Sequence, residues 1–257
     1  MMALHAPRRT LGSILGAVIL LLALGGSGPA RAQSPLAAEA DRLRLRYHED
    51  PARLDAIRAE LEQVLRADSH VDNWLALAQV CFIWGDVRAR TREERLAAYE
   101  RGRQAGERAV ELRPRDAIAH LLYAINIARW GQVNGVVRSL FLLPTVKREI
   151  DTILELDPTL PPAYSLAGNV YAEVPALLGG DLERSEQMFR KGLTIDPQFT
   201  SLRVGLARTL IKQGRIDEAR HELRTVIAEK APRNPADWTV KEAPEARRIL
   251  ASLERRS

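Results

Sequence analysis

Apolar residues recur along this chain at the spacing of amphipathic helices, most clearly within residues 200–231. Two apolar faces with the i, i+3, i+4 spacing of a helix lie on either side of Gly214. They consist of Leu206, Ala207 and Leu210, and then Ala219, Leu223 and Val226. A glycine here suits the left-handed residue that ends a helix. The pattern predicts a helical hairpin, with Ala207 and Ala219 where its two helices approach closely.

The same hairpin pattern occurs three more times upstream, beginning near Trp74, Ala117 and Pro161. Each of these units ends with a proline, which cannot continue a helix and stops it before the next one begins. These prolines are Pro114, Pro158 and Pro197. Four aligned hairpins predict an all-α solenoid of stacked repeats over residues 71–233.

Extra residues interrupt the regular spacing in the first three units. Residues 86–99 are charged and contain Ala and Leu, so we expect them to lengthen the second helix of the first unit. Gly102 and Gly106 then occupy positions where that helix approaches its neighbour. The third unit carries a shorter insertion at residues 174–181.

The insertion of the second unit is unusually apolar. Residues 136–143 contain only two polar side chains, Arg138 and Ser139, and we expect Pro144 to interrupt helical continuity after them. Two interpretations remain open. The segment folds back as core, or Val137, Leu140 and Phe141 offer an apolar face to a ligand or partner.

Both ends of the solenoid require a cover for their apolar faces. Residues 33–70 predict an N-terminal cap of two helices, with Asp50 and Pro51 as the N-cap and first residue of the second. Residues 234–257 predict a C-terminal capping helix with Pro244 in its first turn.

Residues 1–32 have the pattern of a secretory signal peptide. Arg8 and Arg9 form a basic start, residues 11–24 are apolar, and a small-x-small cleavage site ends at Ala32. An uncleaved anchor is the alternative, but the apolar run is shorter than the roughly 20 residues that span a bilayer. We therefore expect cleavage near Ala32, a periplasmic or secreted protein, and no stable membrane span afterwards.

Charge and cysteine content narrow the function further. Loss of Arg8, Arg9 and Arg31 with the leader lowers the formal net charge from +5 to +2. The remaining charges form no concentrated basic stripe, which argues against a nucleic-acid partner. Cys81 is the only cysteine, so no internal disulfide forms, and its place in the repeat predicts an inert, buried thiol.

No constellation for catalysis, cofactor or metal binding stands out. His221 and Glu222 begin a zinc-protease motif, but Thr225 stands where the second histidine is required. His120 is expected to be a structural residue on a first helix, and His70 a loop residue. The sequence therefore predicts a protein that is not an enzyme and holds no cofactor or metal.

The hairpin spacing resembles the tetratricopeptide repeat (TPR), whose period is about 34 residues. The leader, the extended second helices and residues 175–181, followed by Phe189 and Asp196-Pro197, resemble one TPR group. This group is the periplasmic T component associated with tripartite ATP-independent periplasmic (TRAP) transporters. The resemblance covers residues 70 to 230. It implies association with the transporter's substrate-binding protein, and a passage through the helices for apolar ligands.

In a TPR solenoid the first helix of each unit lines the concave face, which predicts a binding groove. The candidate groove residues are Leu75, Gln79, Phe82, Leu121, Ile125, Asn169, Arg208 and Lys212. Asn169 with Arg208 or Lys212 resembles the clamp by which some TPR domains hold a carboxylate. The alternative is that the apolar members only pack against the extended helices.

Two functions follow from this sequence. The first is a non-catalytic adaptor that binds another protein, with a transporter substrate-binding protein as the specific candidate. The second is a carrier that holds a small apolar ligand within the helical array.

Overall fold

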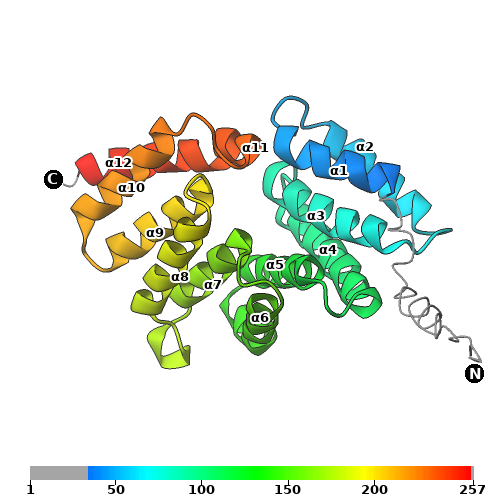
Figure 1. The fold of residues 1–257 in the computed structure, drawn as a ribbon, viewed down its shortest axis with the longest axis horizontal. Coiled ribbons are helices and arrows are strands. Elements are labelled where there is room, and N and C mark those ends of the chain that lie inside the picture. Colours follow the sequence, from blue (N-terminus) through cyan, green and yellow to red (C-terminus); the bar gives the residue numbers. More distant parts are fainter. Residues whose placement is uncertain (1–33, 256–257) are drawn as a thin grey trace, which may run out of the picture. The chain divides into compact units, whose positions relative to one another are not determined.

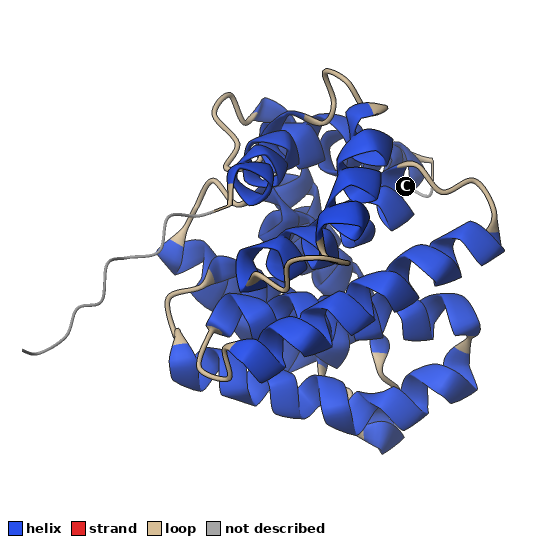
Figure 2. Cartoon of the chain, turned by 90° about the vertical axis from the view of Figure 1, so that its right-hand side faces the viewer, coloured by secondary structure: helices blue, strands red, loops and turns tan. Residues whose placement is uncertain are grey.

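The computed structural model describes residues 34–255, which form helices joined by short loops and contain no strand (Figures 1 and 2). The all-α prediction is confirmed for this part of the chain. The predicted signal peptide lies outside the described residues. Within residues 34–255, no helix is long and apolar enough to cross a membrane.

The chain begins with α1 (Pro35–Arg46) and α2 (Arg53–Val64), which both pack against α3 (Val71–Val87). Leu54, Ile57 and Leu61 on α2 are completely buried there. The predicted start of α2 at Pro51 was wrong. The Asp50 carboxylate instead accepts a hydrogen bond from the Ala52 amide at 3.2 Å, which holds a turn, and the helix begins two residues later.

Three long helices follow in antiparallel succession: α4 (Arg92–Leu112), α5 (Ala117–Asn134) and α6 (Val136–Leu156). The inserted residues lengthen both α3 and α4. Thr91 is the N-cap of α4 and forms a reciprocal capping box with Glu94 in the first turn of that helix. Gly102 and Gly106 lie at the close approach to α5, as predicted. A methyl group on Gly106 would come within 2.7 Å of the Tyr123 backbone.

The prediction that Pro144 interrupts helical continuity was wrong, because α6 runs through it without a break. Leu142 before it and Val146 after it both pack into the same core with α5 and α7. These contacts keep the helix continuous although proline removes one backbone hydrogen bond.

The next two hairpins are shorter. They comprise α7 (Pro161–Glu173) with α8 (Leu182–Ile195), and α9 (Thr200–Lys212) with α10 (Ile216–Ala228). A single 3-10 turn, η1 (Ala176–Leu178), stands between α7 and α8. Gly214 separates α9 from α10 with φ of 79°, the left-handed conformation predicted for it.

The chain ends in α11 (Pro235–Asp237), a π-helical turn η2 (Trp238–Glu242) and α12 (Ala243–Glu254). Ala246, Leu250 and Leu253 of α12 bury their side chains against the core of α9 and α10. α11 in turn contacts α1, so the start of the C-terminal segment meets the first helix of the array (Figure 1). The Tyr47 hydroxyl, completely buried, donates a hydrogen bond of 2.6 Å to Asp237 across this junction.

Candidate functional site

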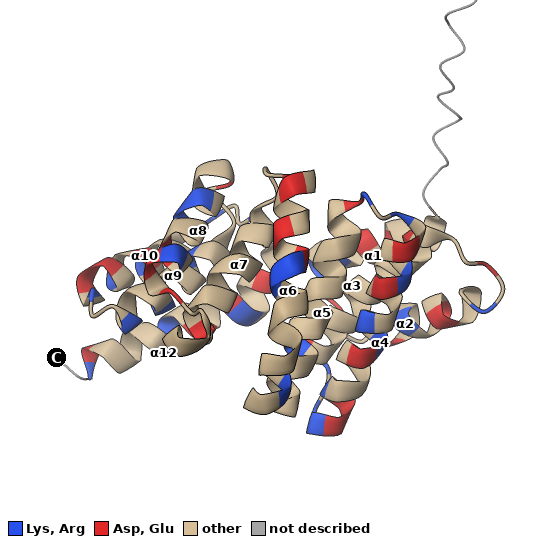
Figure 3. Cartoon of the chain, turned by 90° about the horizontal axis from the view of Figure 1, so that it is seen from below, with Lys and Arg blue, Asp and Glu red and all other residues tan. Residues whose placement is uncertain are grey.

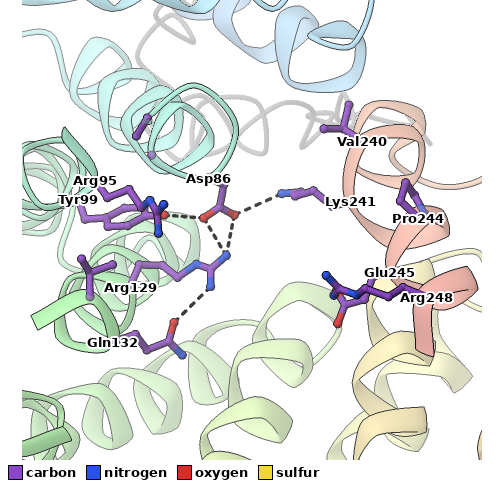
Figure 4. Close-up of a pocket in the computed structure, with 13 residues that line it drawn as sticks. Asp86, Arg95, Tyr99, Arg129, Gln132, Val240, Lys241, Pro244, Glu245 and Arg248 are labelled. Carbon is purple, nitrogen blue, oxygen red and sulfur yellow. Dashed lines mark hydrogen bonds and ion pairs between the residues drawn. The ribbon is translucent and has the colours of Figure 1, made fainter. Parts of the chain in front are cut away.

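The meeting of the two ends encloses a polar pocket of about 650 Å³ (Figure 4). The ends of α3 and α5, the start of α4, and η2 with α12 form its walls. Its charged lining side chains are Asp86, Arg95, Arg129, Lys241, Glu245 and Arg248. Four are cationic and two anionic, so the pocket carries an excess of positive charge.

Asp86 is the centre of this cluster, and its side chain is 5% exposed. Arg129 donates to both carboxylate oxygens at 2.7 Å, and the Tyr99 hydroxyl donates at 2.7 Å. Burial would raise the pKa of Asp86, but the charges of Arg129 and Lys241 outweigh it and hold that pKa below its usual range. Asp86 is therefore an anion at neutral pH and neutralises part of the pocket's charge.

Lys241 reaches Asp86 from the opposite wall, with its ammonium 3.5 Å from the carboxylate. It also pairs with Asp237 at 2.6 Å, so one side chain links η2 to α3 and to the junction with α1. Burial would lower the pKa of Lys241, but the two carboxylates outweigh it and the pKa is raised. The ammonium lies 5.4 Å from the centre of the Phe82 ring, at cation–π distance.

Arg95 and Arg248 are the remaining cations of the pocket, on opposite walls (Figure 4). Both are exposed, and among residues 34–255 neither forms an ion pair. Glu245 beside Arg248 pairs with Arg208 at 3.4 Å. The arrangement presents two unneutralised guanidinium groups, which suit carboxylate or phosphate oxygens.

None of the predicted groove residues lines this pocket. Phe82 lies beneath Arg129 and Lys241, which stack over its ring. Leu75 packs on the N-terminal core, and Gln79 is partly buried on the same helix. Leu121 is buried and Ile125 packs against the same core cluster. The apolar groove residues therefore pack against their neighbours, which is the alternative raised from the sequence.

The residues of the predicted clamp are occupied by contacts within the chain. The Arg208 guanidinium donates to the Asn169 side chain at 3.1 Å. Lys212 donates to the carbonyl oxygen of Ala172 at 2.8 Å and pairs with Glu173 at 2.9 Å. These contacts join α9 to α7.

Sequence reasoning missed the charged cluster. Asp86 lies one helical turn beyond Phe82, and Arg129 one turn beyond Ile125, so extending the groove spacing along the lengthened helices finds both. Lys241 had no comparable signal, because it stands 155 residues from Asp86 and belongs to a π-helical turn.

A second cavity, of about 330 Å³ and largely apolar, lies between α5, α6 and α7. Leu140 lines it. Val137 and Phe141 instead project from α6 and are 70% and 77% exposed. The three residues predicted to form one apolar face therefore lie in two places: Leu140 faces the cavity, and Val137 and Phe141 face the solvent.

Cys81 and the buried His120 lie in surroundings typical of residues that stabilise the fold. Cys81 is fully buried, and this burial raises its pKa to about 12, so the unreactive thiol form predominates. His120 lies 2.6 Å from Glu149 and 3.0 Å from the Pro114 carbonyl oxygen, which occupies both ring nitrogens. In the described part of the chain, no group of three or more His, Cys, Asp or Glu side chains is arranged to hold a metal ion.

Comparison with solved structures identifies the fold. A thermophilic TPR protein of Thermus thermophilus, TTC0263, superposes with a TM-score of 0.59 at 19% identity, over 85% of this chain and 98% of that one. MamA (41-end) from Desulfovibrio magneticus RS-1 gives a TM-score of 0.46 at 14% identity, over 76% of this chain and 94% of that one. The predicted TPR-like solenoid is confirmed. A search of curated proteins gives no match.

Two family models match the sequence. A tetratricopeptide repeat model matches residues 176–243, which include α8, α9 and α10. The model described as Regulator of microtubule dynamics protein 1-3 matches residues 36–177, more than half of the chain. These comparisons do not show the resemblance to the TRAP-transporter component, which stays a prediction. The chain belongs to the family of Regulator of microtubule dynamics proteins 1-3.

Proposed function

We propose that this chain is a non-catalytic adaptor that binds an acidic segment of another protein in the polar pocket. The observation that carries the proposal is the pair of unneutralised guanidinium groups, Arg95 and Arg248, on opposite walls of a pocket in a TPR fold. TPR solenoids are interaction scaffolds that present concave surfaces to partners. Carboxylates entering this pocket would meet Arg95 on one wall and Arg248 on the other.

The Asp86 cluster supports this function by fixing the pocket's shape. Asp86 binds Arg129 and Lys241 and thereby connects helices from both ends of the array. A partner therefore enters a preorganised pocket and does not have to order these walls, which favours affinity. The remaining positive charge also attracts an acidic segment over a distance of about one Debye length, roughly 10 Å at 0.1 M salt.

The compartment and the specific partner are further parts of the proposal. The leader pattern of residues 1–32 supports export, and the resemblance to the transporter component supports a periplasmic substrate-binding protein as the partner. The family's name refers to regulation of microtubule dynamics. We do not extend that role to this chain, because an exported protein leaves the compartment in which a cytoskeleton forms.

Fluorescence anisotropy with a labelled, aspartate-rich peptide tests the pocket directly. The protein should bind this peptide more tightly than a lysine-rich peptide of the same length. Arg95→Glu and Arg248→Glu should each weaken binding by about fivefold or more, since each reverses a charge beside the ligand. Arg247→Glu is the matched control, because Arg247 is exposed on the same helix but does not line the pocket. Equal binding of the two peptides would contradict the proposal.

The apolar cavity supports a second function, the carriage of a small apolar ligand. Leu140, Leu142 and Leu143 from α6 line a space of about 330 Å³, within the size range of small-molecule pockets. Mass spectrometry of organic extracts tests this function. Leu140→Asp should remove a bound apolar compound, whereas Phe141→Asp, at the exposed neighbouring position, should retain it. An extract without any apolar compound would exclude a stably bound cargo.

A further inference from the structure

Within residues 34–255, the most exposed large apolar side chains lie at two places on the chain. Val136, Val137 and Phe141 at the start of α6 are 71%, 70% and 77% exposed, and Leu177 of η1 is 100% exposed. Removing such side chains from water is favourable, so a free surface of this kind favours a partner that covers it. We call these four residues the apolar tips.

The apolar tips belong to one side of the protein. Lys147 of α6 donates to the Gly179 carbonyl oxygen at 3.3 Å, which ties α6 to the residue that follows η1. Val136 and Pro175, at the start of α6 and just before η1, also line the same apolar cavity. Figure 1 shows α6 and the loop between α7 and α8 along the same lower edge of the helical array.

The charges near the apolar tips are mostly cationic, in contrast with the interspersed charges seen over other helices (Figure 3). Residues 117–148 contain no Asp or Glu, and within them Arg138, Lys147 and Arg148 belong to α6. Residues 174–180 around η1 contain no charged residue. The first acid that follows on α6, Glu149, is buried against His120. Asp151, Glu173 and Asp181 are exposed acids that border this surface, and Glu173 pairs with Lys212 at 2.9 Å.

Trp130 adds a residue typical of the boundary between water and lipid. It lies on α5 next to the start of α6, and the Arg138 guanidinium stacks over its ring at 5.7 Å. An aromatic ring beside a cation and exposed aliphatic groups combines the three kinds of side chain that peripheral proteins use at membrane surfaces.

We propose that the apolar tips and the cations Arg138, Lys147 and Arg148 form a docking face for an anionic membrane surface. Val136, Val137, Phe141 and Leu177 enter the boundary between headgroups and acyl chains, while the cations bind lipid phosphates. Single side chains that project from two separate turns suit a deformable lipid surface better than a protein groove of fixed shape. This docking is independent of the polar pocket and would hold the adaptor at a membrane without a spanning helix.

Sedimentation with lipid vesicles tests the docking face. The protein should bind vesicles that contain about 30% phosphatidylglycerol in phosphatidylcholine, and bind pure phosphatidylcholine at least about fivefold more weakly. Leu177→Asp and Phe141→Asp should each reduce binding to the anionic vesicles by about tenfold or more. Arg138→Gln with Arg148→Gln should reduce it by about 25-fold, since each cation near a membrane is worth about a factor of five.

Val64→Asp is the matched control, because Val64 is 38% exposed on α2 and outside the docking face. It should bind vesicles as the unaltered protein does, and circular dichroism should give the same helical content for all variants. Absence of vesicle binding by the unaltered protein would overturn the proposal. Equal loss of binding in Val64→Asp and Leu177→Asp would overturn it as well. The peptide assay for the polar pocket uses no lipid, so the two proposals fail separately.

Discussion

At Gly102 the backbone of α4 lies directly against the side chain of Asn126 on α5. The Asn126 amide group donates to the carbonyl oxygens of Ala78 and Leu122 at 3.1 and 2.8 Å, so it cannot move without losing both bonds. A methyl group added at Gly102 would overlap the Asn126 side-chain oxygen. We therefore expect Gly102→Ala to lower the free energy of unfolding by about 1–3 kcal/mol, although alanine is the better helix former.

Chemical denaturation of a double-mutant cycle measures this effect. Asn126→Ala should cost less in the Gly102→Ala background than in the unaltered protein, because the larger residue at position 102 has already disturbed the asparagine. Additive costs at the two positions would mean that the contact does not limit the packing of α4 on α5.

The titration of Glu242 makes the stability of the folded protein depend on pH. Its burial raises its pKa from 4.5 to about 7, with Asp237 and Glu245 adding to the rise and the Thr200 hydroxyl and Lys241 opposing it. Between about pH 4.5 and 7 the folded protein keeps this proton while the unfolded chain has lost it. Stability contributed through this group therefore falls as the pH rises through that window.

Glu242→Gln removes the titration and keeps an acceptor for the Thr200 hydroxyl. We expect the variant to match the unaltered protein in free energy of unfolding near pH 4.5, and to exceed it by about 3 kcal/mol at pH 8. Parallel stability curves for the two proteins across this range would show that folding does not raise the pKa of Glu242.

Among the elements, α6 carries a proline in its interior without a break in the helix. An interior proline costs a helix about 3 kcal/mol relative to alanine, because it removes a hydrogen bond and crowds the preceding turn. Since Pro144 is exposed, Pro144→Ala should raise the free energy of unfolding by about 1–3 kcal/mol.

Denaturant unfolding checks this prediction, with Pro161→Ala as its control. Pro161 is the first residue of α7 and follows an extended N-cap residue, so its proline removes no helical hydrogen bond and its replacement should change stability by less than about 1 kcal/mol. A loss of stability in Pro144→Ala would mean that the proline is part of a favourable local structure at this point of α6.

The elements that the sequence predicted well are those with local causes. Pro114, Pro158 and Pro197 follow helix ends because proline cannot continue a helix. Pro144 does not end its helix, because the core contacts of Leu142 and Val146 on either side of it outweigh the local cost of the proline. The start of α2 was misplaced for a related reason, because Asp50 forms a turn with Ala52 in place of a helix cap.

For the molecule as a whole, the decisive feature is the contact between its N-terminal helices and the segment α11–η2. It depends on Tyr47 with Asp237 and on Lys241 with Asp86, pairs separated by 190 and 155 residues. No periodicity in a single sequence connects such distant positions, so the polar pocket could not be predicted although its individual helices could. The predicted binding groove stays a prediction, and its apolar candidates Leu75, Leu121 and Ile125 pack against the core clusters.

This contact can be weakened without altering the repeats. Tyr47→Phe with Lys241→Met removes the hydrogen bond to Asp237 and one of the cations from Asp86, while Arg129 and Tyr99 still satisfy Asp86. Amide hydrogen exchange should then accelerate by about tenfold or more in residues 235–242 and remain unchanged in α4 and α5. Equal acceleration throughout the chain would indicate global destabilisation, and no acceleration would contradict a role for these contacts in closure.

The most direct test of the adaptor function is affinity purification of the protein from its own cells, followed by native mass spectrometry. The account predicts that one protein with an acidic exposed segment accompanies the unaltered chain and the Arg247→Glu variant. It also predicts that Arg95→Glu with Arg248→Glu loses this protein while keeping its fold. The same accompanying protein on all three chains, or none on any of them after chemical crosslinking, would contradict the assignment of the polar pocket as the partner site.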